Sequence, residues 1–330
     1  MKRKAYGAIA LTAVLLIVNF GATKAGAQGT ANTVEAHVAA AKTAGGQDYA
    51  RMVENLCSAP APPAAQPAAA RPYPPPASEW DAEPAKVFDN LYYVGSKTVG
   101  SWAVTTSAGI IILDALFEYS VEEEIVNGLK KLGLDPAQIK YVVVSHAHGD
   151  HYAGAPFLQD RLKAPILMAA ADWDYIASQR NPSKPRRDRV VTDGQKLTLG
   201  DTTITMYLTP GHTPGTISFL VPVWDGAQQH LASMWGGTAF NFPRTAENFR
   251  IYANSAQRFA DIVRQNPVDV VLTNHPDNSR VHEKIAGLRG RQSYEPHPFV
   301  VGKDSQLNHL KVASECAQAQ MLRVSGGASR

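Results

Sequence analysis

The sequence HAHGDH, at residues 146–151, places three histidines and one aspartate within six positions, directly after an apolar run. His146 and His148 alternate along the chain, so both imidazole rings can point to the same side of an extended segment. Asp150 and His151 come at the turn that follows and can face a second ion. Imidazole and carboxylate groups at this density are typical of a metal site with two adjacent ions. The alternative is a polar loop whose histidines cap the following helix.

Two later histidines lie in loops that also suit metal ligands. His212 is bracketed by prolines and glycines in TPGHTPG, residues 209–215, and such a tight, rigid loop presents a ligand without flexing. His275 follows a second apolar run and precedes Pro276, where a strand opens into a turn. Together the three loops predict one ligand set for each of two ions, both with coordination left open for solvent. The sets are His146, His148 and His212 for one ion, and Asp150, His151 and His275 for the other.

The beginning of the chain has the features of a secretory signal peptide. Basic residues at positions 2–4 precede an apolar run at residues 8–18, and small residues at 25–27 predict cleavage after Ala27. The apolar run is too short to span a bilayer, and no later stretch reaches the roughly 20 residues that spanning requires. We therefore expect a periplasmic or secreted protein that is not in the membrane after signal cleavage.

The overall composition limits the partners of the protein. Of its 330 residues 45% are apolar, which is enough for a large core. The formal net charge of +3 gives no electrostatic case for binding nucleic acid or a membrane surface. We expect a small-molecule substrate, and none of these features predicts the oligomeric state.

The chain has two cysteines, Cys57 near its beginning and Cys316 near its end. In an oxidising compartment a disulfide between them would persist, but sequence alone does not establish that their geometry permits one. Neither cysteine has the spacing of a thiolate zinc site.

The remaining pattern predicts a single folded domain after an N-terminal extension. The extension, residues 28–80, contains a helix-compatible part at 31–57 and a linker rich in alanine and proline at 59–76. The domain, residues 81–330, alternates strand-like and helical runs, which predicts an α/β protein. Strands are expected at residues 91–94, 102–106, 110–113, 141–145, 166–168, 202–208, 217–221, 230–234 and 268–273, and helices at 121–132, 152–162, around 173, 246–263 and 307–322.

The motifs SHAHGDH, TPGHTPGTISF and VLTNHP, in this order, resemble the signature of the metallo-β-lactamase superfamily over roughly residues 85–325. The resemblance implies an αββα sandwich of two mixed β-sheets flanked by helices, and the six ligands above. It also implies that Asp114, at the end of a strand, orients a ligand rather than binding metal.

One departure from the superfamily pattern points to a subclass. Most of its hydrolases carry a bridging aspartate in a GDT-like segment, but here Gly237 stands where that carboxylate is expected. This is similar to the third subclass of zinc metallo-β-lactamases. The similarity implies an exported antibiotic-resistance enzyme with two Zn²⁺ ions, in which a zinc-bound hydroxide opens the β-lactam amide. Asp150 would orient this hydroxide as the catalytic residue and also bind the second ion.

The segment at residues 238–243, TAFNFP, lacks the serines that usually receive the β-lactam carboxylate in this subclass. Thr238 and Asn241 are the candidate substrate contacts, whereas Phe240 and Phe242 indicate either an apolar pocket wall or ordinary core aromatics. The altered segment keeps other hydrolases on the same scaffold open, namely a lactonase, an esterase or a hydrolytic dehalogenase of aromatic compounds. A non-catalytic metal-binding protein is a further alternative, and iron or manganese also suits these ligands.

Overall fold

The computed structural model describes residue 1, residues 32–59 and residues 72–327. The predicted signal peptide, apart from its first residue, and most of the predicted linker lie outside this part of the chain. The described residues from 32 onward belong to one compact unit. None of the helices in the described part is long and apolar enough to cross a membrane.

The first sheet of the described chain has seven strands in sequential order. Neighbouring strands are antiparallel from the first to the fourth strand and parallel from the fourth to the seventh, so the sheet is mixed. The strands are β1 (Ala85–Phe88), β2 (Leu91–Tyr93), β3 (Trp102–Thr106), β4 (Gly109–Leu113), β5 (Ile139–Val143), β6 (Ile166–Ala169) and β7 (Arg189–Val191).

The second sheet of the described chain has five strands in the order β12-β11-β10-β9-β8. Only the pair β11 and β12 is parallel within it, so this sheet is mixed as well. The strands are β8 (Gln195–Leu199), β9 (Thr202–Leu208), β10 (Ile217–Asp225), β11 (Gln228–Trp235) and β12 (Val268–Thr273).

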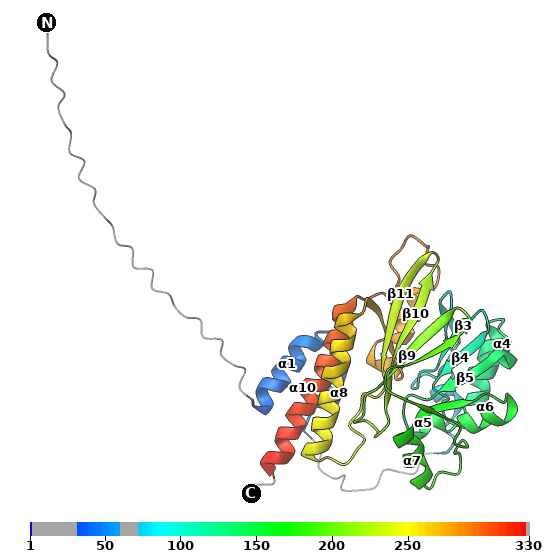
Figure 1. Cartoon of the computed structure of the whole chain (residues 1–330), viewed down its shortest axis with the longest axis horizontal. Coiled ribbons are helices and arrows are strands. Elements are labelled where there is room, and N and C mark those ends of the chain that lie inside the picture. Colours follow the sequence, from blue (N-terminus) through cyan, green and yellow to red (C-terminus); the bar gives the residue numbers. More distant parts are fainter. Residues whose placement is uncertain (2–31, 60–71, 328–330) are drawn as a thin grey trace. The chain divides into compact units, whose positions relative to one another are not determined.

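The two sheets pack face to face and helices cover both outer faces (Figure 1). Trp102, Phe219 and Met234 are among the fully buried side chains between the sheets. One set of helical segments packs on the first sheet: η1 (Glu122–Asn127), α4 (Gly128–Lys131), α5 (Gly149–Tyr152), α6 (Ala155–Arg161) and α7 (Ala170–Ser178). Another set packs on the second sheet: α1 (Val34–Gly45), α2 (Ala50–Cys57), α8 (Ala246–Gln265) and α10 (Lys303–Gly327). The predicted αββα sandwich is confirmed.

The short segments that complete the described chain are α3 (Ala77–Trp80), η2 (Pro136–Gln138), η3 (Pro276–Asn278) and α9 (Val281–Gly287).

The N-terminal segment forms two helices where the sequence indicates one helix-compatible stretch at residues 31–57. The side chain of Thr33 caps α1 by accepting a hydrogen bond from the amide of Ala36. Met52 and Leu56 of α2 are buried in the same apolar cluster as α8 and α10. A disulfide joins Cys57 at the end of α2 to Cys316 in α10, which answers the pairing that the sequence leaves open. The segment is therefore an integral part of one helical layer.

Local contacts explain where the elements differ from the sequence pattern. The helix expected at residues 152–162 is the shorter α6, and a separate turn, α5, precedes it on the other side of Gly154. A Cβ on Gly154 would overlap the carbonyl oxygen of Ala115, so the chain needs glycine here to pass close to the neighbouring loop. The helix expected at 121–132 begins as the wide π-helical turn η1 and continues as α4. Strands β1, β7 and β8 are short and partly exposed, which is why hydrophobic periodicity misses them.

Candidate metal centre

The six predicted ligands converge where loops from both sheets meet. The parallel strands β5 and β12 deliver two of these loops, and the turn between the antiparallel strands β9 and β10 delivers the third. The ligands are His146 and His148 after β5, Asp150 and His151 in α5, His212 between β9 and β10, and His275 after β12.

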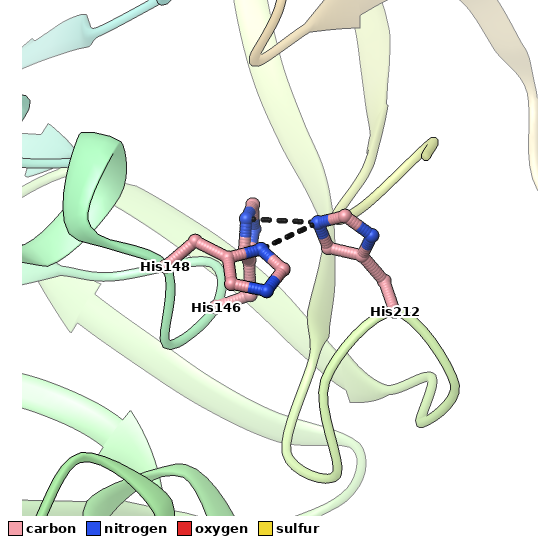
Figure 2. A group of neighbouring side chains, drawn as sticks. All are labelled: His146, His148 and His212. Atoms are coloured by element: carbon pink, nitrogen blue, oxygen red, sulfur yellow. Dashed lines mark hydrogen bonds between the residues drawn. The ribbon is translucent and has the colours of Figure 1, made fainter. Parts of the chain in front are cut away.

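The first ligand set brings three imidazoles to one point (Figure 2). Nε2 of His212 lies 3.1 Å from Nε2 of His146 and 2.9 Å from Nδ1 of His148. Nitrogens about 2.1 Å from one tetrahedral zinc ion would lie roughly 3.4 Å from one another. The three nitrogens are thus close to the spacing that a single ion requires.

Backbone carbonyls orient two of these rings. Nδ1 of His146 donates to the carbonyl of Gly236 at 2.8 Å, and Nδ1 of His212 donates to the carbonyl of Ala239 at 2.5 Å. Each bond places the proton on Nδ1 and leaves the lone pair of Nε2 directed at the common point. His148 presents its Nδ1 instead. This assignment of protons is what a neutral, ligating imidazole needs.

The second set is built in the same way but includes a carboxylate. Nδ1 of His151 donates to Oδ2 of Asp114 at 2.9 Å, and Nδ1 of His275 donates to the carbonyl of Thr98 at 3.0 Å. Nε2 of His151 lies 3.3 Å from Nε2 of His275. Oδ2 of Asp150 is 3.2 Å from the first of these nitrogens and 3.6 Å from the second.

The two sets adjoin each other. Possible donor atoms of His146, Asp150 and His151 also lie within 4.8 Å of one another, so one histidine of the first set borders the second. Imidazole nitrogens and a carboxylate oxygen with open coordination positions are donors that suit zinc. The residues present therefore fit the predicted pair of ions chemically.

Asp114 lies where the sequence resemblance places an orienting carboxylate. Its backbone has a positive φ of 69°, which is uncommon for a residue with a side chain and turns the carboxylate toward the ligand loop. Besides the bond to His151, Oδ1 accepts from the amide of Ser145 at 2.6 Å and Oδ2 from its hydroxyl at 2.8 Å. Asp114 thus supports the second ligand set and the start of the loop that carries the first.

Asp172 is a buried carboxylate that the sequence patterns do not reveal. Its oxygens accept from the amide of Ala147 at 2.9 Å, the hydroxyl of Thr213 at 2.7 Å and the amide of Gly215 at 2.7 Å. These bonds tie the loop of the first two histidines to the loop of His212. The one available signal is an aspartate in the first turn of α7, on an otherwise apolar helix face.

A glycine at position 237 is a steric requirement of this site. A Cβ there would overlap the imidazole of His212, so the aspartate that bridges the metals in other hydrolases cannot be placed without moving a ligand. Hydrogen bonds also hold the segment, because the hydroxyl of Tyr252 donates to the carbonyls of Gly237 and Thr238 at 3.1 Å and 2.8 Å.

Burial sets the charge of the first ligand set. It lowers the pKa of His148 to about 4 and that of His212 to about 3, and it holds the pKa of His146 well below its usual range. Burial also lowers the pKa of His275. These four rings are therefore neutral near pH 7, with a lone pair available for metal.

His151 is charged in the absence of metal. Burial alone would lower its pKa, but the carboxylates of Asp150 and Asp114 outweigh burial and raise it to about 10. Burial would raise the pKa of Asp150, yet the charge of His151 outweighs that effect and holds this pKa well below its usual range. The second set thus contains a buried ion pair whose proton must leave before His151 can bind metal.

Two adjoining pockets lead to the metal centre. The first, of ≈ 270 Å³, is lined by ligands of both sets and by the candidate contacts Thr238 and Asn241. The second, of ≈ 500 Å³, shares His212 and Asn241 with the first and has a largely apolar lining that includes Phe242. Phe240 and Phe242 both pack against Phe249 and Tyr252. Both aromatics that the sequence leaves ambiguous are therefore packing residues, and Phe242 also forms a wall of the second pocket.

Comparison with known proteins relates this centre to a family. Residues 98–223 match the family model of the metallo-β-lactamase superfamily. The hydroxyacylglutathione hydrolase of Acidiphilium cryptum is 36% identical over 83 residues, which are 25% of this chain and 31% of that protein. An N-acyl homoserine lactonase of a Bacillus species is 32% identical over 104 residues, 30% of this chain and 40% of that protein. The chain thus spans less than half the length of these curated relatives.

Similarity to a solved structure extends over the whole body. BJP-1, a subclass B3 metallo-β-lactamase of Bradyrhizobium japonicum, is 25% identical and superimposes with a TM-score of 0.63 over 76% of this chain and 98% of its own. The sandwich fold, the histidine-rich ligand group and the matching family model agree, and they confirm the likeness to the metallo-β-lactamase superfamily that the sequence motifs indicate.

Proposed function

We propose that the protein is an exported zinc-dependent β-lactamase that binds two zinc ions through the two ligand sets. The observation that carries this proposal is the glycine at position 237, which stands where a bridging carboxylate would be and leaves two triads of candidate ligands. The likeness to a subclass B3 metallo-β-lactamase over 98% of its length supports a β-lactam as substrate.

Zinc bound here would act as a Lewis acid on the scissile carbonyl and would lower the pKa of a water molecule to about 7. Asp150 lines the pocket with its side chain 23% exposed, so its ionised carboxylate would accept a hydrogen bond from the attacking water and orient it. Thr238 and Asn241 line the same pocket and would hydrogen-bond the substrate.

Export to the periplasm or the medium is part of the proposal. It rests on the signal peptide predicted at residues 1–27, nearly all of which lies outside the described part of the chain. The disulfide between Cys57 and Cys316 supports it, because disulfides persist in oxidising compartments and are rare in the cytosol. An exported β-lactamase would act in antibiotic resistance.

The test is hydrolysis of a chromogenic cephalosporin by the purified, zinc-loaded protein, with zinc counted on the same sample. We expect turnover that a chelator abolishes and that added zinc restores, at two ions per chain. Absence of turnover with two ions bound would contradict the β-lactam substrate.

Asp150→Ala tests the role of Asp150. The variant should lose the second ion and most of the activity, and full activity with two ions bound would contradict this role.

A lactonase is the second candidate. The sequence similarity to N-acyl homoserine lactonases and the apolar pocket beside His212 favour it, because that pocket suits an acyl chain. Turnover of acyl lactones, with a rate that rises with acyl chain length, would support this candidate in a preparation that does not open cephalosporins. Esters and halogenated aromatics complete the same screen.

A further inference from the structure

We propose that helix α2 of the N-terminal segment forms part of the substrate-binding site, with the guanidinium of Arg51 as the receptor for an anionic group of the substrate. This inference rests on the proposed function only in that a substrate occupies the pocket at the metal centre. It assigns a recognition role to a segment outside the region that matches the family model.

One face of α2 lines the metal pocket. Arg51, Met52, Asn55 and Leu56 border the same pocket as His148, Asp150, His212 and His275. The spacing of these four residues is that of a single helix face, and the residues between them point elsewhere, as Glu54 does by lining a separate surface hollow. The N-terminal helix and the candidate ligands therefore enclose one space.

The position of α2 is fixed rather than incidental. Met52, Val53 and Leu56 are buried against the helical layer, and the disulfide at Cys57 ties the end of the helix to α10. Nε2 of Gln320 also donates to the carbonyl of Leu56 at 2.7 Å. A helix that is packed, hydrogen-bonded and covalently linked can hold a recognition side chain in a defined place.

Arg51 is the side chain suited to bind an anion. Among the described residues that line the pocket, it is the one with a permanent positive charge. The candidate contacts Thr238 and Asn241 are uncharged. The side chain of Arg51 is 69% exposed, and its ion pair runs from Nη1 to Oδ2 of Asp277 at 3.0 Å. The fork of five N–H donors leaves further donors for a carboxylate.

The apolar pocket completes the description of the substrate. Tyr175, Phe242 and Ile251 line it on the other side of His212 and Asn241. A molecule bound at the metal centre thus has a cationic side chain on one side and an apolar wall on the other. The substrate class that fits is a small amide or ester that carries a carboxylate at one end and an apolar group at the other.

Arg51 has a competing structural role that the test must separate. Asp277 lies two residues after His275, so the ion pair also joins α2 to the loop of a candidate ligand. Arg51→Ala removes both the cation and the ion pair, whereas Asp277→Asn removes the ion pair and keeps the cation. Glu54→Gln, on the other side of α2, is the matched control.

The probes are two thiols that differ only in charge, 4-mercaptobutyrate and 4-mercaptobutyramide. Their binding to the cobalt-substituted full-length protein is followed through the thiolate-to-cobalt absorption band. We expect Arg51→Ala to weaken binding of the carboxylate about three- to tenfold and to leave the amide unchanged. Asp277→Asn should bind the carboxylate as tightly as the native protein or more tightly, and Glu54→Gln should match the native protein with both probes.

Salt provides a second readout. Added salt should weaken carboxylate binding to the native protein more than to Arg51→Ala, because ions screen an exposed charge. Equal losses for both thiols in Arg51→Ala and Asp277→Asn would overturn the proposal, since they would show that Arg51 acts by holding the His275 loop. Neither readout requires β-lactam turnover, so the two proposals can fail separately. If the native protein does not open cephalosporins but Arg51→Ala selectively loses affinity for the carboxylate thiol, the β-lactamase assignment is overturned and the anion site is supported.

Discussion

The two ligand sets of the metal centre differ in charge. His146 and His212 of the first set are buried, His148 is half-buried, and all three rings are neutral near pH 7. In the second set His151 is fully buried, whereas the side chains of Asp150 and His275 are 23% and 30% exposed. The second set also contains the charged pair of Asp150 and His151.

This difference indicates that the two sets bind their ions with different strength. The first set needs no proton removed and its loops are tied together by Asp172, so it is organised to hold an ion permanently. Both sets border the pocket, but the second set must give up a proton to bind metal. We infer that the two ions bind with unequal affinity and that the second site is the more exchangeable one.

The largest expected effect comes from removing one ligand from each set. His212→Ala should lower the affinity for the first ion by more than roughly 100-fold, because it removes a direct donor. Loss of a residue that only hydrogen-bonds a metal ligand costs up to about 100-fold. His275→Ala should leave the first ion in place and remove only the second. Zinc content after dialysis against graded chelator measures both variants. Loss of both ions in His275→Ala would show that the sets are not independent.

Restoring the missing carboxylate should damage the first set rather than strengthen the second. Gly237→Asp introduces a Cβ that overlaps the ring of His212, so we expect weaker binding of the first ion. Gly237→Ala should produce the same defect, because the Cβ alone causes the overlap. Zinc titration of both variants tests this expectation. Tighter binding of the second ion in Gly237→Asp would show that the loop moves enough to make a bridge.

The supporting carboxylates should affect different sets. Asp172→Asn replaces an acceptor oxygen with a donor and should weaken the first ion about 10–100-fold. Asp114→Asn should weaken the second ion over the same range of about 10–100-fold, because His151 loses its charged partner. Affinities measured by competition with a chromophoric chelator check each variant. If each variant lost zinc affinity equally at both sites, the two sets would not be distinct.

The smallest effect is a difference in pH dependence. Because the pKa of His151 is raised to about 10 without metal, affinity for the second ion should rise by up to about tenfold per pH unit as pH increases toward that value. The pKa values of His148 and His212, about 4 and about 3, lie well below neutral pH, so protonation of these rings does not make the affinity for the first ion depend on pH there. Zinc affinities measured between about pH 6 and about pH 9 would show the difference. Identical slopes would contradict the assigned charge states.

The strands and long helices were predictable because their signals are local. Strands β3, β9 and β12 match the expected ranges, since β3 and β9 are unbroken runs of apolar or β-branched residues and β12 is interrupted only by Asp269. The packing of α1 and α2 was not predictable, because their partner α10 lies more than 250 positions away. The break between α5 and α6 likewise depends on a contact of Gly154 with a distant loop.

The candidate ligands were apparent from sequence because metal binding demands particular residue types at close spacing. Asp172 and Arg51 carry no such pattern, since each is a single charged residue that reaches the site from another element. The steric reason for glycine at position 237 was also invisible, because the overlap is with a ring 25 positions earlier in the chain. Residues that act through the fold become recognisable only when the fold is known.

The link between Cys57 and Cys316 has a consequence for the order in which the protein is made. The two cysteines are 259 positions apart, and a ribosome synthesises α2 long before it reaches α10. Every candidate metal ligand has therefore been synthesised before the partner cysteine that clamps α2 exists. A chain that stops short of residue 316 would carry the full set of ligands but lack the covalent clamp on one wall of its pocket.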